Sequence, residues 1–299
     1  MNGTCMVNFY KLDAWSKWEM TACSLRKYVS GDHIQLARTK EMEESPQIPK
    51  LGGSPKKMSR RKNSQNAAKL NGPSTMPVPV TVPAAVTLKS ARLLPRSFFE
   101  RHPRIVARQL LGKLLVRRSA GLLLAGRIVE TEAYLGSGDD AAHAASGKTA
   151  RSSVLFGPAG HAYVYFTYGM HHCMNVSCER EGRAGCVLLR ALEPVAGFES
   201  MAIARGLASS IRDARSRAAS KNLRLLASGP GRLCQALGIT RNRDNGKDLL
   251  AKNSDLVLMR MDAGVRLGRI LTSQRIGIRR SMELPLRFLL AENPFISRK

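Results

Sequence analysis

Segments with strand-type alternation, separated by glycine-containing breaks, constrain the fold of this chain most. Two of them, KLLVRR and LLLAGRIVETEAYL, flank the short break SAG and predict a hairpin. A glycine-rich loop, GSGDDAAHAASGKTARSS, follows. Three further strands are then predicted in AYVYFTYG, CMNVSCE and GCVLLRALEP. Strands joined by short glycine turns favour an antiparallel sheet.

Helices are predicted on both sides of this strand region. PRSFFERHPRIVARQLLG has near-helical apolar spacing and ends at Gly112, a glycine stop. Residues 197–226 are rich in Arg and Ala, and SGPGRLCQALGI predicts a capped short helix whose N-terminal amides could hold a phosphate. RLGRILTSQRIGIRR and LPLRFLLAENPFIS alternate again and should close the sheet.

Residues 1–90 differ from the rest in composition. SPKKMSRRKNSQNAAKLNGPSTMPVPVTVPAAV combines basic residues, small polar residues and repeated Pro, which cannot bury enough apolar surface to offset chain entropy. We therefore expect a disordered basic N-terminal arm over 1–90 and a folded domain over 91–299. Trp15 and Trp18 fit the arm less well, and a small helix or a different start codon would explain them equally.

Positive charge points to a polyanionic partner. The 48 Lys and Arg against 22 Asp and Glu give a net charge of +26 and a pI of about 10.6, a field that attracts phosphate backbones. Residues 1–90 hold 14 basic and 6 acidic side chains, so residues 91–299 still carry +18. No run of 18 apolar residues and no signal-peptide pattern occurs, so we expect a soluble chain that is not secreted and has no membrane partner.

The cysteines and histidines do not predict a metal site. The six cysteines form no C-x-x-C pair and are expected to be reduced thiols. His171 and His172 are adjacent, so on a strand they would point to opposite faces. We expect no metal and no cofactor.

Polar side chains alternate along one predicted strand and suggest either a surface or a site. Glu130, Glu132 and Tyr134 occupy every second position of GRIVETEAYLG. Such a face is most often solvated, because a half-exposed strand needs this alternation. The alternative is a pair of carboxylates that does acid–base chemistry.

Aromatic residues make up only 5% of the chain, yet four of six tyrosines fall between 134 and 168. Tyr163 and Tyr165 should share one strand face, whereas Tyr168 should face the other way or leave the strand at Gly169. The rings could be core residues with tethered hydroxyls, or they could form a base-stacking pocket and a wedge.

Several long motifs in order resemble the alkyladenine DNA glycosylase family, in the wording of its bacterial members. They are RIVETEAYLG, DDAAHA, FGPAGHAYVYFTYGMHHCMNVSCE, GCVLLRALEP and SGPGRLCQALGI, and the resemblance runs from about Leu93 to Ser297. It implies an α+β fold: a single compact domain with a strongly curved, mostly antiparallel β-sheet and peripheral helices. It also implies a monofunctional enzyme that flips alkylated or deaminated purines out of duplex DNA and hydrolyses their N-glycosidic bond.

The resemblance assigns a role to each matching position. Glu132 corresponds to the general base, Arg190 to an arginine near the attacking water, and Tyr168 to the side chain that enters the duplex. The positions that contact the base or water are Tyr134, His143, Tyr165, Asn175, which crowds the amine of guanine, and Ile276 through its carbonyl. Glu130 is expected to be structural. The implied partner is double-stranded DNA with damaged purines, bound by a monomer, in the cytoplasm with the nucleoid of a bacterium or in a eukaryotic nucleus.

Two other functions remain open from the sequence. A non-catalytic nucleic-acid binder would explain the charge and the tyrosines, but it has no use for Glu132. A bifunctional glycosylase that also cleaves the strand needs an amine nucleophile, for which Lys148 and Lys221 are the candidates between residues 114 and 246.

Overall fold

A computed structural model describes residues 90–119, 121–208, 217–261 and 267–298 of the chain. The predicted arm and its two tryptophans lie outside the described residues, so the boundary near residue 90 stays a prediction. The strands are β1 (Arg92–Leu93), β2 (Leu114–Ser119), β3 (Leu122–Tyr134), β4 (Ala162–Thr167), β5 (His171–Ser177), β6 (Cys186–Ala196), β7 (Leu256–Arg260), β8 (Ile270–Ser273) and β9 (Arg287–Leu290). The helices are α1 (Pro103–Leu110), α2 (Phe198–Ala204), α4 (Arg217–Ala227), α5 (Pro230–Ala236) and α6 (Arg241–Asp244), with 3-10 turns η3 (Arg96–Phe98) and η4 (Ser153–Phe156).

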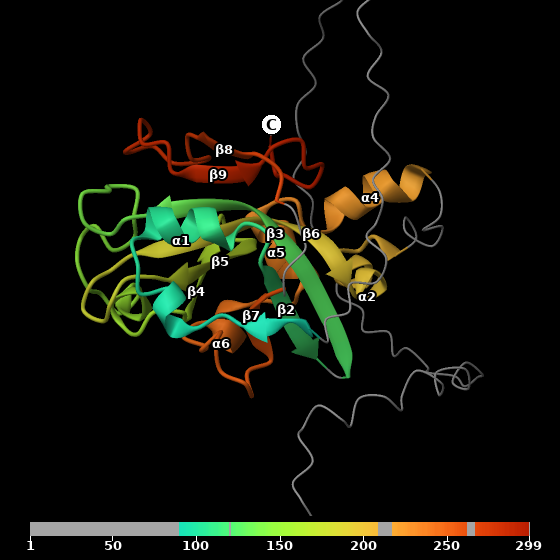
Figure 1. The fold of residues 1–299 in the computed structure, drawn as a ribbon, viewed down its shortest axis with the longest axis horizontal. Coiled ribbons are helices and arrows are strands. Elements are labelled where there is room, and N and C mark those ends of the chain that lie inside the picture. Colours follow the sequence, from blue (N-terminus) through green and yellow to red (C-terminus); the bar gives the residue numbers. More distant parts are fainter. Residues whose placement is uncertain (1–89, 120, 209–216, 262–266, 299) are drawn as a thin grey trace, which may run out of the picture. The chain divides into compact units, whose positions relative to one another are not determined.

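The strands form one antiparallel sheet that curls into a half-barrel. Its order is β1-β7-β2-β3-β6-β5-β4, and β9 pairs with both β3 and β8. The long strand β3 is central: it pairs with β6 on one side and with β2, then β9, on the other (Figure 1). The expected α+β class, with a curved antiparallel sheet and peripheral helices, is confirmed.

Bulges in β3 supply part of the curvature. Its register with β6 shifts on both sides of Glu130, where Ile128 pairs with Leu192 and Thr131 pairs with Leu189. An extra residue in one strand increases the local twist and bends the strand. The bend occurs where the alternating carboxylates lie.

Helix α1 packs its apolar side on the sheet and ends as the sequence predicts. Val106, Ala107 and Leu110 are fully buried. Gly112 has φ +83°, and a Cβ placed there would lie 2.2 Å from Leu267. The positive φ is the feature that favours glycine here, because the exposed side chain of Leu267 can move away from an added Cβ.

Two sequence expectations need correction. β7, in the run LVLMR, was not predicted, although it pairs with both β1 and β2. The SGPGRLCQALGI segment forms the short helix α5, but it is not capped as predicted, because its N-cap residue is Gly229 and no side chain caps it. Glycine has no side-chain oxygen that could accept a hydrogen bond from the first amides of the helix.

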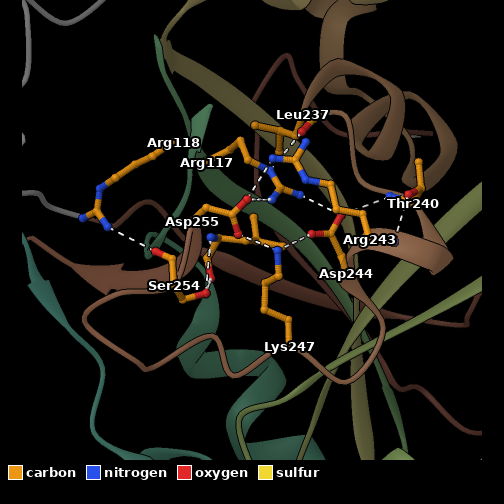
Figure 2. Close-up of polar contacts among 10 residues, drawn as sticks. Arg117, Arg118, Leu237, Thr240, Arg243, Asp244, Lys247, Ser254 and Asp255 are labelled. Carbon is orange, nitrogen blue, oxygen red and sulfur yellow. Dashed lines mark hydrogen bonds and ion pairs between the residues drawn. The ribbon is translucent and has the colours of Figure 1, made fainter. Parts of the chain in front are cut away.

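A buried ion network joins β2 to the segment before β7. Arg117 is fully buried and donates to Asp244 at 2.7 Å, to Asp255 at 3.0 Å and to the Leu237 carbonyl at 3.2 Å (Figure 2). Lys247 bonds to the same two carboxylates, and Figure 2 shows them between the two cations. Every charge here has a partner, as burial of charge requires.

The segment held by this network also covers the free edge of β4. Asn245 Oδ1 accepts from the Val164 amide at 3.0 Å, the Gly246 amide donates to the Ala162 carbonyl at 2.7 Å, and the Ala162 amide donates to the Lys247 carbonyl at 2.9 Å. These bonds satisfy backbone groups that an edge strand would otherwise leave open.

Candidate active site

The two carboxylates of β3 lie inside the protein. Glu130 and Glu132 are both 0% exposed, so the expectation of a solvated strand face is wrong. Their side of β3 is covered by Arg190 from β6, Arg287 from β9 and Ser297, which follows β9 in the chain. Buried carboxylates need such partners, because an isolated charge is costly away from water.

Glu130 accepts four hydrogen bonds from three residues. It accepts from Arg190 Nε at 3.0 Å, from Arg287 Nε at 2.8 Å, and from the Ser297 amide and hydroxyl at 2.5 and 2.8 Å. These contacts join β3, β6, β9 and the chain end. They support the structural role predicted for Glu130.

Glu132 is held by three donors and faces the aromatic side of the sheet. The Ile276 amide donates to its Oε1 at 2.7 Å, Arg190 Nη1 lies 3.1 Å from the same oxygen, and the Tyr134 hydroxyl donates to Oε2 at 3.0 Å. Burial raises the pKa of Glu132 above its ordinary value, although Arg190 and the Ile276 amide oppose the shift. A carboxylate with a raised pKa is suited to accept a proton near neutral pH.

Arg190 bridges the two carboxylates. Burial works against its charge, but Glu132 and Glu130 outweigh this and raise the pKa of Arg190 above its usual value. The guanidinium also donates to the Ser297 hydroxyl at 3.3 Å and lines the adjacent pocket. It therefore remains a fixed positive charge beside Glu132.

Aromatic rings form a wall near Glu132. His143 and Tyr165 have ring centroids 4.6 Å apart in an edge-to-face arrangement, and Tyr163 lies 5.7 Å from Tyr165 on the same strand face. His143 Nδ1 and the Tyr163 hydroxyl are 2.9 Å apart. Burial among these rings, and then Arg151, lower the pKa of His143 to about 4, so its ring is neutral at physiological pH.

Tyr163 belongs to the core, whereas Tyr134 and Tyr165 are partly accessible. Tyr163 is 2% exposed, so the interpretation of these rings as core residues holds for it. Tyr134 and Tyr165 are half-buried. Burial raises the pKa of both hydroxyls above the usual tyrosine value, which keeps them protonated.

Asn175 lies in the same pocket and is 3% exposed. Its Nδ2 donates to the Tyr163 carbonyl at 3.3 Å, and the Cys186 thiol lies 3.7 Å from its Oδ1. These contacts fix the amide in one orientation. A fixed amide can discriminate between ligands by the groups placed against it.

These side chains surround one pocket of about 560 Å³. All the predicted site residues except Glu132 line it: Tyr134, His143, Tyr165, Tyr168, Asn175, Arg190 and Ile276. Glu132 lies directly behind the wall, bonded to three lining residues: Tyr134, Arg190 and Ile276. Clefts of this size, with aromatic walls and a few fixed polar groups, are typical binding sites for small organic ligands.

Tyr168 stands apart from the other rings at the β4–β5 turn. It is 78% exposed with φ +53°, Gly169 has φ +66°, and the Met170 amide donates to the Thr167 carbonyl at 3.2 Å. Two central residues with positive φ define a tight hairpin turn, which favours glycine and strains a tyrosine. The prediction that Tyr168 leaves the strand face is confirmed, and a core role for it is wrong.

Several residues that shape the site were not singled out from the sequence. Arg275 and Asp139 lie inside quoted motifs, yet neither received a role. Exposed arginines from separate segments also line the pocket: Arg151, Arg279, Arg280 and Arg298. None of these four forms an ion pair with another described residue. The net positive charge of the sequence indicated that such arginines exist, but only the fold brings these four to one pocket.

Within the described residues, no group of three His, Cys, Asp or Glu side chains could hold a metal ion. The four cysteines among them, Cys173, Cys178, Cys186 and Cys234, are buried free thiols, as predicted. No helix in the described part of the chain is long and apolar enough to cross a membrane.

Comparison with known proteins gives a consistent result. The model of the family described as "Methylpurine-DNA glycosylase (MPG)" matches residues 97–294. A protein of Koribacter versatilis is 56% identical over 206 residues, covering 69% of this chain and 93% of that protein. One from Carboxydothermus hydrogenoformans is 45% identical over 207 residues, covering 69% of this chain and 100% of its own length. Both bear the name "Putative 3-methyladenine DNA glycosylase".

Proposed function

Because this chain belongs to the methylpurine-DNA glycosylase family, we propose that the pocket beside Glu132 is where it cuts damaged purines from DNA. The chain is a 3-methyladenine DNA glycosylase, which acts in base-excision repair of alkylated purines. It is an enzyme, so the alternative of a non-catalytic nucleic-acid binder is wrong. The observation that carries the proposal for the site is a buried carboxylate behind an aromatic pocket of about 560 Å³.

The damaged purine would occupy the aromatic pocket after leaving the duplex. Tyr134 supports one wall, and the edge-to-face pair His143 and Tyr165 forms another. Stacking on such rings holds any purine, and it strengthens for a purine that carries positive charge. A purine alkylated at a ring nitrogen is such a cation.

Glu132 would act as the general base. It takes a proton from a water molecule while the water oxygen bonds to the anomeric carbon, and the bond from that carbon to the purine breaks with its electron pair leaving on the base. The transition state resembles an oxocarbenium ion, so the carboxylate also stabilises its developing positive charge. Arg190, 3.1 Å from Glu132, orients the carboxylate and lies at the pocket where the water would sit.

Selection would come from charge and shape together. A cationic alkylated purine is a good leaving group, so it needs less help from the enzyme. Asn175, which the resemblance matches to the residue that crowds the amine of guanine, is held rigidly in the pocket by its bonds to Tyr163 and Cys186. A rigid amide there would reject normal guanine while adenine-derived bases enter.

Tyr168 would fill the gap that the flipped base leaves. Its ring projects from the hairpin tip, and extrusion costs a few kcal/mol of stacking, which an inserted ring offsets in part. The exposed arginines of the pocket rim would bind the phosphates on either side. All of these groups come from one chain, so we propose that the protein acts as a monomer. We also propose that it is located with the DNA, in the bacterial nucleoid or in a eukaryotic nucleus.

The test is a panel of duplex oligonucleotides, each with one defined lesion: a methylated purine, hypoxanthine or ethenoadenine. After incubation, alkaline cleavage reveals abasic sites. We expect cleavage at lesions only, and no strand break before alkali. Strand cleavage with a borohydride-trapped adduct would instead support the bifunctional alternative, and absence of abasic sites for every lesion would contradict the proposal.

A further inference from the structure

Arg275 lies directly against an active-site ring. Its side chain is fully buried, and its guanidinium carbon is 4.7 Å from the centroid of the Tyr134 ring. Tyr134 lines the pocket, whereas Arg275 does not. The guanidinium therefore supports the ring from the protein side, and a planar cation on an aromatic ring is a favourable contact.

The same guanidinium joins two loops that form different parts of the pocket. It makes a two-pronged pair with Asp139 at 2.6 and 2.8 Å and donates to the Ser281 carbonyl at 3.2 Å and the Ala133 carbonyl at 3.1 Å. Ser281 ends the loop that carries Ile276 to Arg280 into the pocket. Only Nε lacks a hydrogen-bond partner among the described residues.

Asp139 organises the loop that leads from β3 to His143. It is fully buried and accepts from the Leu135 amide at 3.0 Å and the Ala141 amide at 3.2 Å. Burial works against its charge, but Arg275 and these amides hold the pKa of Asp139 below its usual value. The ion pair with Arg275 is therefore maintained at neutral pH.

The pair also reaches the reacting carboxylate by one further bond. The residue after Arg275 is Ile276, whose amide donates to Glu132 at 2.7 Å. A shift of Arg275 would thus move the Tyr134 ring, the Ile276 amide and the Asp139 loop together.

We propose that Arg275, paired with Asp139, is a positioning residue. It fixes the Tyr134 ring and the Ile276 amide relative to each other, so that the purine in the pocket and the carboxylate of Glu132 are held in the geometry that the reaction requires. The inference rests on the proposed function of this pocket. Lysine cannot replace Arg275, because an ammonium group lacks the planar fork that bonds Asp139 twice and lies flat on a ring. A displacement of about 1 Å in an active site can cost on the order of a hundredfold in rate.

Arg275→Lys is the test, and the chain supplies a matched control in Arg117→Lys. Arg117 is also a fully buried arginine paired with a fully buried aspartate, Asp244, and it lines no part of the pocket (Figure 2). Arg275→Lys loses the two-pronged pair with Asp139, and Arg117→Lys loses the fork that reaches Asp244 and Asp255. The two variants should therefore be destabilised to a similar extent. Differences between them therefore report the position of Arg275, not the general loss of a buried pair.

Two measurements separate positioning from folding. Single-turnover excision is measured on a duplex with one hypoxanthine, at a temperature where melting curves show both variants folded. Affinity is measured in the Glu132→Gln background for this duplex and for one with a tetrahydrofuran abasic analogue, which has no base to stack on Tyr134. The second duplex thus tests DNA binding without the base pocket.

We expect Arg275→Lys to slow excision on the order of tenfold to a hundredfold and to weaken binding of the hypoxanthine duplex but not of the abasic analogue. Arg117→Lys should match the wild type in its excision rate and in its affinity for both duplexes. The inference would be overturned if both variants slowed excision equally, or if Arg275→Lys weakened binding of the hypoxanthine duplex and the abasic analogue to the same extent. If Arg275→Lys does not fold, Asp139→Asn is measured in its place with the same criteria. A wild type that produces abasic sites at none of the lesions of the oligonucleotide panel would refute the proposed function itself.

Discussion

Replacement of Tyr168 by serine separates a DNA-inserting ring from a structural one. Tyr168 lies at the tip of the β4–β5 hairpin, 78% exposed, with a φ of +53°. Both tyrosine and serine are strained by this backbone angle, so the substitution does not relieve it. The change removes the ring and leaves the rest of the turn as it is.

The expected effect on stability is small. A fully buried aromatic ring removes about 150–250 Å² from water, and a ring that keeps 78% of its exposure removes roughly a fifth of that. At about 25 cal/mol per Å², the loss is ~1 kcal/mol, or about 2–4 °C in melting temperature for a domain of this size. Tyr163→Ser, on the same hairpin but 2% exposed, should cost about 3–5 kcal/mol instead.

The expected effect on excision is large by comparison. Because the inserted ring offsets part of an unstacking cost of a few kcal/mol, its loss should slow single-turnover excision and weaken binding of lesion DNA by about tenfold or more, since ~1.4 kcal/mol is tenfold. Tyr168→Phe keeps the ring and should retain both. A Tyr168→Ser protein that melts many degrees lower, yet excises normally when folded, would refute this reasoning.

Three further predictions concern pH, the N-terminal segment and the buried network. Burial raises the pKa of Glu132, and only the ionised carboxylate accepts a proton, so the excision rate should rise with pH through that raised pKa. His143 has a pKa of about 4 and should stay neutral. A second change in the excision rate near pH 6.5, the ordinary pKa of histidine, would contradict this. A chain starting at residue 90 loses 14 basic and 6 acidic side chains; its affinity for undamaged DNA should fall and depend less steeply on salt, whereas loss of lesion preference would show that residues 1–89 read the base. Arg117→Met leaves Asp244 buried without its main partner and should cost about 3–5 kcal/mol in urea unfolding, with unchanged excision per folded molecule; altered excision would mean that this network reaches the pocket.

Local patterns predicted most of the fold. Alternation and glycine breaks placed the β2–β3 hairpin and strands β4, β5 and β6, because each of these segments is long enough to show a period of two. β7 has five residues, and four of them are buried. A strand covered on both faces is an apolar run without alternation, which periodicity alone does not distinguish from other buried segments.

The structure brings the predicted site residues together, but the groups that surround them were not predictable from the sequence. The spacing of Tyr163, Tyr165 and Tyr168 predicted two different directions, which the structure confirms. Burial of Glu130 and Glu132 was missed, because the covering groups Arg287 and Ser297 are more than 150 residues away along the chain. Alternation reports which side chains share a face, but distant segments determine whether that face meets water.

The bonds around Glu132 also make its replacement by glutamine well defined. A glutamine oxygen can still accept from the Ile276 amide and Arg190, and its amide can donate to the Tyr134 hydroxyl, so the pocket keeps its shape. What is lost is the ability to take a proton from water.

Single-turnover excision by Glu132→Gln, on duplex DNA with one alkylated purine, tests the central claim most directly. We predict a rate lower by roughly 100-fold or more, as for removal of a general base, with affinity for the same duplex retained. Excision close to the wild-type rate would contradict the role of Glu132, and loss of affinity in parallel with rate would show that the carboxylate holds the DNA and does not act on it.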